Sequence, residues 1–555
     1  MNNQIVDFEE TDVSKIRDDF PQKRDCFSKI KQYFLKPNIS RVCIIYGLRR
    51  TGKTILLKQT LLSLSEEERK KSVFITCNYK TDFYNVLSFL KQKLDSGYKN
   101  FFIDEITYAK NFQNLAEVLS DNFVANYNAK ILLTGTDSLG LSLPSHSNLY
   151  DRAEFVHTTY VSFPEFARIT GNHSIDYYMK HGNTLSDFCP FDNYSDTQEY
   201  VETSIVSNLI CSLQKSESVR SYPPALTELY DNNDLDNAIQ RIINQYPQAI
   251  TMKALRKQFD LSPLDNAVNA LANTREDKDF TIKSTVLSNV ITNNVKKLLN
   301  ISDFKTNITE QHLNDIKSFL KEMDVITSIP VISSFEQNIQ NVDMEFITHP
   351  GMYHANLAYT IDVLNNNNNW MPNATNEQKQ SLLKSVYDCS AGKIQENFII
   401  ADVYKMLCED NILNKQKWYV SKLSKRINNI DEEADLIIFD KLNKEVYLFE
   451  IKHSSQIHES QSKHLESENF IEYVKLNFGT IKGCAVLYNG NNDVSMKIPR
   501  FNAAAFLEHI YNNCSNSDYS INDTIQYLTT RPSQKTDKEQ NLHSKSISDD
   551  DISVS

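Results

Sequence analysis

Short apolar runs alternate with helix-like segments over the first 135 residues of the chain. The apolar runs cover residues 41–46, 71–79, 100–105 and 129–135, and segments with helical character lie between them at 51–64, 82–95 and 111–127. Such alternation is typical of βα units around a buried parallel sheet. It predicts an α/β domain here, with a mixed α+β domain as the alternative.

The middle of the chain, from about 160 to 330, is mostly helical in pattern. Within 308–326, apolar residues recur at helical spacing, namely Leu313, Ile316, Phe319 and Leu320, and an extended run follows. A helix followed by a hairpin is how a winged helix ends, and a plain helical bundle fits the pattern equally well. The Asn-rich stretch 364–373 indicates a linker or an exposed loop. Residues 385–500 return to a mixture of helices and strands.

These patterns predict an α/β multidomain protein. We expect an N-terminal extension (1–21), a first α/β domain (22–170), a helical region (171–275), a winged-helix-like region with a linker (276–380), a second α/β domain (385–510) and a disordered tail (530–555). The tail is polar and nearly free of large apolar residues, which is why we expect disorder there.

Composition narrows the class of protein. Of the 555 residues, 40% are hydrophobic and 23% charged, which is ordinary for globular domains. No apolar run approaches the ~18–20 residues of a membrane helix, and the N-terminal segment has no apolar signal region. The nine Cys form no CxxC pair, so we expect reduced thiols and a cytoplasmic protein. Since the net charge is -12, any contact with nucleic acid must be local.

One motif is strong. The pattern GxxxxGK[ST] is formed by Gly47, Leu48, Arg49, Arg50, Thr51, Gly52, Lys53 and Thr54. Its glycines let successive backbone N–H groups point at phosphate oxygens, and the helix that follows adds the positive end of its dipole. Lys53 is expected to reach the β- and γ-phosphates of ATP, and the Thr54 hydroxyl to bind Mg²⁺. The sequence therefore predicts a P-loop.

Acidic and polar residues end the next strands. Asp104 closes an apolar run and is predicted to engage Mg²⁺, while Glu105 is predicted to act as the general base that polarises the attacking water. The fourth run ends near Thr134 and Thr136, and either hydroxyl suits a sensor of the γ-phosphate.

The segments GLRRTGKT, FFIDEI, LLTGTDSL and LYDRAEFVHTTYVSFPEFARI (149–169) occur in this order. Over residues 22–185 the chain thereby resembles a STAND-like branch of the AAA+ ATPases that is abundant in archaea and many bacteria. The resemblance implies a P-loop NTPase fold of the AAA+/ASCE type and a role near the γ-phosphate for Arg152. One departure is Asp151, where the family usually has Gly.

A hairpin is predicted near the C-terminus. The extended runs 434–439 and 446–452 flank a polar loop at 440–445. If the hairpin closes symmetrically, the numbers of paired residues sum to 885, and Asp435 faces Glu450. Two carboxylates placed so closely suggest a divalent cation between them, and Lys452 projects from the same face as Glu450. Such a group can bind Mg²⁺, activate water and stabilise a phosphorane-like transition state.

The motifs around this hairpin also resemble a family. GKIQENF (392–398), WY (418–419), EAD (433–435) and FEIK (449–452) are similar, over residues 385–490, to the C-terminal domain that accompanies this ATPase family, which has a PD-(D/E)xK restriction-endonuclease-like fold. The resemblance implies that Asp435 and Glu450 bind Mg²⁺ or Mn²⁺, that Lys452 is the catalytic lysine and that Glu396 completes the site. The "PD" pair is Ala434-Asp435 here, which leaves open an active nuclease or a nuclease fold used only for binding.

Basic residues near this site (Lys415, Lys417, Lys422, Lys425 and Arg426) either neutralise phosphates or form a solvated face. The sequence thus predicts an ATP-hydrolysing AAA-type ATPase coupled to a metal-dependent, nuclease-like domain that acts on nucleic acid, DNA being favoured. The main alternative is a STAND-like nucleotide switch whose inactive nuclease-fold domain binds a protein partner. A third is an ATPase with a purely structural C-terminus. No membrane partner is expected, and an oligomer fits either main hypothesis.

Overall fold

The structure is a computed structural model of the chain. It describes residues 7–36, 41–111, 118–135, 152–182, 184–185, 193–216, 224–261, 308–332, 342–367, 375–409, 416–427 and 430–530, and everything below concerns these residues. They divide into two compact units. The first comprises residues 1–330 and 343–402, and the second residues 331–342 and 403–555. The predicted tail lies outside the described residues beyond Thr530.

The first unit contains a six-stranded sheet in the order β1-β3-β4-β5-β2-β6. Its parallel strands are β2 (Val42–Tyr46), β3 (Ser72–Thr76), β4 (Asn100–Asp104), β5 (Lys130–Thr134) and β6 (Ala153–His157). The predicted parallel sheet is confirmed. Because β5 lies between β2 and β4, the carboxyl end of β5 is adjacent to those of both neighbours.

The sequence analysis did not predict two strands of this sheet. β1 (Glu9–Thr11) belongs to the segment that we expected to be a mere extension, and it pairs antiparallel with β3 as an edge strand. Its sequence, EET, carries no apolar alternation, because an exposed edge strand has little to bury. β6 extends the other edge beside β2.

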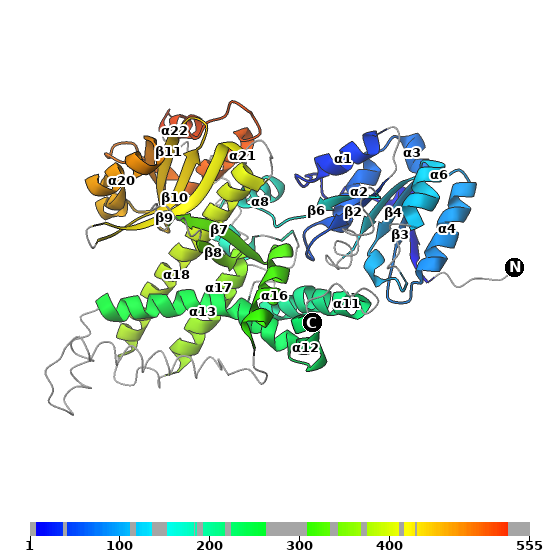
Figure 1. Cartoon of the computed structure of the whole chain (residues 1–555), viewed down its shortest axis with the longest axis horizontal. Helices are drawn as coiled ribbons and strands as arrows, with labels where there is room; N and C mark the ends of the chain where they lie inside the picture. Colours follow the sequence, from blue (N-terminus) through cyan, green and yellow to red (C-terminus); the bar gives the residue numbers. More distant parts are fainter. Residues whose placement is uncertain are drawn as a thin grey trace, which may run out of the picture. The chain divides into compact units, whose positions relative to one another are not determined.

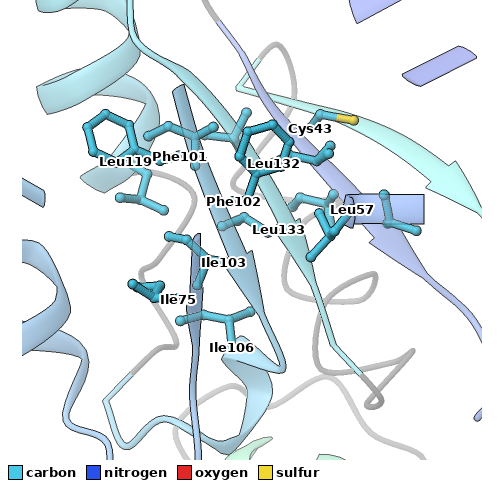
Figure 2. Close-up of a cluster of buried hydrophobic side chains, with 14 of the residues drawn as sticks. Cys43, Leu57, Ile75, Phe101, Phe102, Ile103, Ile106, Leu119, Leu132 and Leu133 are labelled. Carbon is cyan, nitrogen blue, oxygen red and sulfur yellow. The ribbon is translucent and has the colours of Figure 1, made fainter. Parts of the chain in front are cut away.

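Helices pack against the sheet and complete its core (Figure 1). They are α1 (Phe27–Leu35), α2 (Lys53–Leu62) and α4 (Phe83–Asp95), with the π-helical turn η4 at Ser120–Val124. The short helices α3 (Glu66–Lys70) and α6 (Ala125–Tyr127) bury no residue. Figure 2 shows the centre of the core, where Phe101, Phe102 and Ile103 of β4 lie among Leu132 and Leu133 of β5 and Leu57 of α2. This apolar packing holds the strand ends, and the polar side chains on them, in fixed register.

The rest of the first unit is mostly helical, as expected. It contains α8 (Phe163–Thr170), α9 (Ile175–His181), α10 (Tyr194–Tyr200), π-helical η5 (Val201–Val206), α11 (Ser207–Ser216), α12 (Pro224–Asp231), α13 (Leu235–Leu261), α16 (Glu310–Glu322), α17 (Pro350–Asn366) and most of α18 (Asn376–Tyr404). α16 buries Ile316, Phe319 and Leu320, as the spacing predicted, and two strands follow it. These are β7 (Ile326–Ile332) and β8 (Val342–Ile347).

The second sheet is mixed, and most of its strands belong to the second unit. Its order is β13-β12-β11-β10-β9-β7-β8, so the strands of the predicted winged-helix hairpin are the last two strands of this larger sheet. The further strands are β9 (Trp418–Ile427), β10 (Ile430–Asp440), β11 (Glu445–Lys452), β12 (Thr480–Tyr488) and β13 (Arg500–Asn502). Helix α20 (Glu468–Phe478) buries Phe470, Val474 and Phe478 in the same core cluster as strand residues.

Two further helices follow the last strand. The predicted domain end at residue 510 falls inside α21 (Ala503–Asn513), and α22 (Ile521–Thr530) then buries Ile521 and Leu528. Of the helices that the structure describes, none is both long enough and apolar enough to cross a bilayer.

Candidate nucleotide site and C-terminal carboxylate cluster

The P-loop follows β2 directly and needs glycine where it begins. Gly47 has φ +143°, and a Cβ built on it would lie 2.3 Å from Thr158 Oγ1 and 2.7 Å from the Thr158 carbonyl oxygen. Gly52, with φ +89°, stands in the left-handed region immediately before α2 begins at Lys53. Both positions therefore require glycine, because a residue with a side chain would be strained in these backbone conformations.

Lys53 lies inside the loop with its ammonium group turned onto loop carbonyls. Its Nζ donates hydrogen bonds to the carbonyl oxygens of Gly47 (2.8 Å) and Leu48 (2.7 Å). Burial lowers the pKa of Lys53 to about 8, although the negative charges of Glu105 and Asp104 oppose the shift. An anion that enters the loop would therefore meet a buried cation whose charged form it stabilises.

The acidic end of β4 and the polar end of β5 meet. The Thr134 hydroxyl hydrogen-bonds to the Asp104 carboxylate and accepts a hydrogen bond from the Glu105 backbone N–H at 3.2 Å. Asp104 is 3% exposed and Thr134 is fully buried. Glu105 has φ +55°, a left-handed conformation that is uncommon outside glycine and often marks functional sites. Of the two sensor candidates, Thr134 touches the acids, and Thr136 lies outside the described residues.

Residues outside the P-loop motif contact the loop and stabilise it. Thr51 Oγ1 hydrogen-bonds to the Leu48 carbonyl (2.7 Å) and contacts Thr158 Oγ1 at 2.8 Å. The Tyr200 hydroxyl donates to the Arg49 carbonyl oxygen at 3.3 Å. Arg49 in turn donates to the hydroxyl of Tyr108 (2.6 Å), and the Arg50 carbonyl accepts from the Leu185 N–H (2.9 Å). These contacts join distant parts of the sequence, which is why spacing could not reveal them.

The donor set at this edge suits a magnesium ion. Thr54 lies in the first turn of α2 and is half-buried, and Asp104 supplies a carboxylate from the neighbouring strand end. Hydroxyl and carboxylate oxygens are ligands that Mg²⁺ prefers in proteins. These two residues remain the ones that would hold the ion.

Arg152 lies away from this edge. It precedes β6, whose first residue pairs with the first residue of β2, whereas the P-loop follows the last residue of β2. The length of β2, five residues or roughly 16 Å at 3.3 Å per residue, therefore separates the backbone of Arg152 from the start of the P-loop. The Arg152 guanidinium instead pairs with Asp121 at 3.0 Å. The structure therefore places Arg152 at the amino end of β6, and its role near the γ-phosphate stays a prediction.

The C-terminal hairpin has the predicted register. The pairs Leu436–Phe449, Phe439–Val446 and Asp440–Glu445 each sum to 885, so the strands close symmetrically about the loop. On its other side, β10 has an irregularity against β9 between Ala434 and Ile437, the stretch that holds Asp435. Bulges of this kind often re-aim a side chain beside a functional site.

Asp435, Glu450 and Lys452 gather as predicted, and a second lysine joins them. Lys452 Nζ lies 2.5 Å from Glu450 Oε2 and 3.1 Å from Asp435 Oδ2, and Lys422 Nζ lies 3.4 Å from Asp435 Oδ1. Asp435 Oδ2 also accepts the Ile451 N–H at 2.9 Å. Both carboxylates are buried, at 4% and 2% exposure. Sequence reasoning had assigned Lys422 to a phosphate-binding or solvated face.

The two carboxyl groups differ in pKa. Burial opposes ionisation of Asp435, yet the ammonium groups of Lys452 and Lys422 and the Ile451 N–H hold the pKa of Asp435 below its usual value. Burial first, and then the Asp435 charge, raises the pKa of Glu450 to about 8. Among the described residues, Glu450 Oε1 has no hydrogen-bond partner. The pKa values of the two carboxyl groups are thus shifted in opposite directions, and Glu450 Oε1 is an acceptor oxygen that a cation would satisfy.

The remaining candidates make other contacts. Glu396 belongs to the first unit, where its carboxylate pairs with Lys393 at 2.5 Å. Lys417 donates to the Tyr519 carbonyl oxygen at 2.7 Å, and Lys425 lies over the Tyr473 ring. Lys415 and the side chain of Arg426 lie outside the described residues. In the part of the chain that the structure covers, no three His, Cys, Asp or Glu side chains are grouped as a metal ion would require.

Comparison with known proteins identifies the first sheet. A family model described as "AAA domain" matches residues 40–167. No curated protein matches the chain. Two solved structures are similar at 12% identity. One, AMPPCP-bound DnaA from Aquifex aeolicus, is matched over 53% of this chain and 86% of its own with a TM-score of 0.20. The other, a DNA replication initiation factor, is matched over 51% and 82% with a TM-score of 0.18. Scores this low carry no argument about function, whereas the family match and the P-loop sheet together make residues 40–167 an AAA-type ATPase domain.

Proposed function

We propose that the first unit binds and hydrolyses Mg·ATP. The observation that carries this proposal is the meeting of three strand ends at one edge of the sheet: the P-loop after β2, the acids after β4 and Thr134 at the end of β5. Ligands of open α/β sheets bind at the carboxyl ends of the strands, where these groups lie.

Each residue then has a chemical role. The loop amides and Lys53 bind the phosphates, and Thr54 and Asp104 hold the magnesium ion, which neutralises charge that develops on the phosphates. Glu105 orients the attacking water and accepts its proton. The Thr134 hydroxyl holds the Asp104 carboxylate and the Glu105 backbone N–H, and it thereby fixes the positions of the two acidic residues relative to one another. Arg152 contributes only where the nucleotide of a neighbouring copy lies against it.

Two substitutions test the ATPase. Lys53→Ala should abolish ATP binding in calorimetry, because the loop loses its buried cation. Glu105→Gln should bind ATP normally and hydrolyse it at least ~100-fold more slowly, since general-base catalysis contributes about that much. Glu68→Gln, an acid in the exposed capping box of α3, is the control that should leave turnover unchanged. Ordinary turnover in both test variants would refute the assignment.

We further propose that the second unit is a nuclease-like domain that acts on nucleic acid, with DNA favoured, in a reaction coupled to ATP hydrolysis. Asp435 and Glu450 would hold a divalent cation, Mg²⁺ or Mn²⁺, and that ion would supply an activated water. Lys452 would stabilise negative charge on the phosphate. Support comes from the two buried carboxylates that share Lys452 and from the orphan oxygen of Glu450. Glu396 stays a proposed fourth member.

A matched pair of variants tests this second site. Asp435→Asn should abolish cleavage of DNA in the presence of Mn²⁺ while ATP turnover persists. Asp440→Asn is the control, because Asp440 is equally buried on the same strand but caps the hairpin turn through the N–H groups of Leu442 and Asn443. Equal cleavage by both variants would exclude a catalytic Asp435.

The competing function is a nucleotide switch whose second unit binds a protein partner without cutting. One observation favours it: two lysines already compensate the carboxylate pair, so the cluster is electrically satisfied without an ion. Absence of cleavage by the unmodified protein with either Mg²⁺ or Mn²⁺, together with retained ATP binding, would establish the switch over the nuclease.

A further inference from the structure

Arg24 and Glu165 form a buried ion pair that touches the P-loop. Arg24 precedes α1, and Glu165 lies on α8, so 141 residues separate them. The guanidinium binds the carboxylate in a bidentate manner, with Nε 2.7 Å from Oε1 and Nη2 3.1 Å from Oε2. The side chains are only 5% and 1% exposed. Neither residue has a role in the site described so far.

The same guanidinium reaches the backbone of the loop. Its Nη1 donates to the Thr51 carbonyl oxygen at 2.6 Å, and its Nη2 donates to the Thr159 carbonyl oxygen at 3.0 Å. Arg24 thus connects the P-loop, the segment that follows β6 and helix α8. Glu165 holds the guanidinium in place and also accepts the backbone N–H of Asp25 at 2.8 Å.

The Thr51 carbonyl belongs to the peptide group that carries the N–H of Gly52. Because a trans peptide is planar, its oxygen and its hydrogen point to opposite sides. A guanidinium fixed on the oxygen therefore fixes the direction of the Gly52 N–H, which is one of the amides expected to contact phosphate. Gly52 has no side chain and lies at φ +89°, so the backbone there needs an external restraint to keep one orientation.

Stability alone does not account for this pair. Buried ion pairs contribute little net stability, and apolar side chains of similar volume can replace them at little cost. What an apolar pair cannot supply is a set of donors in a rigid fork that reaches two backbone carbonyls and a carboxylate together.

We propose that Arg24 and Glu165 are positioning residues for nucleotide binding, holding the Thr51–Gly52 peptide so that its N–H stays directed at the triphosphate. The inference rests on the proposed ATP-binding function. It names a restraint that acts on the loop from behind, through residues that do not touch the nucleotide.

The test separates positioning from folding. Arg24→Met combined with Glu165→Gln removes both charges and leaves an amide oxygen for the Asp25 N–H. We expect its thermal unfolding midpoint to stay near that of the unmodified protein, while the Kd for ATP rises at least tenfold. Arg24→Lys keeps the charge but lacks the fork, and it should raise the Kd at least threefold. An ATP Kd within twofold of the unmodified protein in both variants would overturn the proposal.

A matched control lies on the same two segments. Arg168 of α8 donates to the Lys23 carbonyl oxygen and to Asp25, each at 2.8 Å. Arg168→Met should leave the Kd for ATP unchanged, and an equal rise there would show that the effect is a general loosening of α8. If the unmodified protein does not bind ATP, the proposed function is wrong. If the unmodified protein binds ATP and the Arg24 variants bind it with the same Kd, only this inference is wrong.

Discussion

The start of the P-loop offers a quantitative test, because Gly47 and Gly97 both have positive φ but lie in different surroundings. Gly47 has φ +143° and would place a Cβ 2.3 Å from Thr158 Oγ1. Gly97 has φ +90°, yet nothing lies within 4 Å of a Cβ built on it. Alanine at Gly97 therefore reports the backbone strain alone, whereas alanine at Gly47 reports strain plus steric overlap.

The expected magnitudes follow from these distances. Forcing a non-glycine residue into a positive-φ conformation costs about 1–3 kcal/mol. Overlap adds about 1–3 kcal/mol more, since the Cβ would press on both the side chain and the carbonyl of Thr158, and the carbonyl cannot rotate away. Gly47→Ala should thus lose about 2–6 kcal/mol of stability in total unless the loop moves. Moving the loop would displace the amides that hold phosphate and weaken ATP binding at least tenfold.

Two assays on both variants decide the matter. Urea unfolding should show a larger loss of stability for Gly47→Ala than for Gly97→Ala, and calorimetry should show weakened ATP binding for Gly47→Ala only. If Gly47→Ala binds ATP as tightly as the unmodified protein, the contact between Thr158 and the loop does not shape the site. If Gly97→Ala weakens binding equally, the steric reasoning is wrong.

Three further predictions concern residues with defined partners. Thr134→Val should retain ATP binding but lower ATP turnover by about tenfold or more in a phosphate-release assay. The reason is that the hydroxyl that links Asp104 to the Glu105 backbone is lost. Unchanged turnover would show that Thr134 has no part in the mechanism. Burial lowers the pKa of His349 from 6.5 to about 4, so the folded state resists protonation, and stability falls as the pH drops below 6.5. The loss at pH 5 is about 2 kcal/mol, and His349→Gln should flatten this part of the denaturation profile; an unaltered pH dependence contradicts the assignment. Lys422→Met should raise the pKa of Asp435, which NMR titration of the labelled carboxyl can follow, since one of its two ammonium partners is removed; no shift would mean that Lys452 alone sets the charge.

Local patterns predicted much of the fold. The apolar runs located β2 to β5 because a strand buried on both faces must be apolar along its whole length. The hairpin register was also predictable, because a symmetric loop between two apolar runs determines which residues face one another. That register predicts that Asp435 and Glu450 face one another, and the observed pairs have the same register.

Other features depended on contacts between distant residues. β1 is short, polar and at an edge, so its sequence carries no signal of burial. Arg24 pairs with a residue 141 positions away, and no spacing rule connects them. Lys422 is one of several basic residues for which the sequence allowed phosphate binding or a solvated face, and the pairing of β9 with β10 brings it to Asp435. Its role could have been found only by asking which strand pairs with β10.

The order of strands explains why the choice between Thr134 and Thr136 could not be made from sequence. Strands β2, β3, β4 and β5 follow one another in the sequence, and this order does not indicate that β5 lies between β2 and β4 in the sheet. Once it does, the last residue of β5 lies next to both the P-loop strand and the strand that ends in Asp104, and its side chain has the two acids within reach. A hydroxyl there hydrogen-bonds to both a carboxylate oxygen and a backbone N–H. An apolar side chain would leave both of these polar groups without that hydrogen bond. The polar character of Thr134 at the end of the apolar strand KILLT thus follows from the position of β5 in the sheet, and its contacts with Asp104 and the Glu105 backbone depend on that insertion.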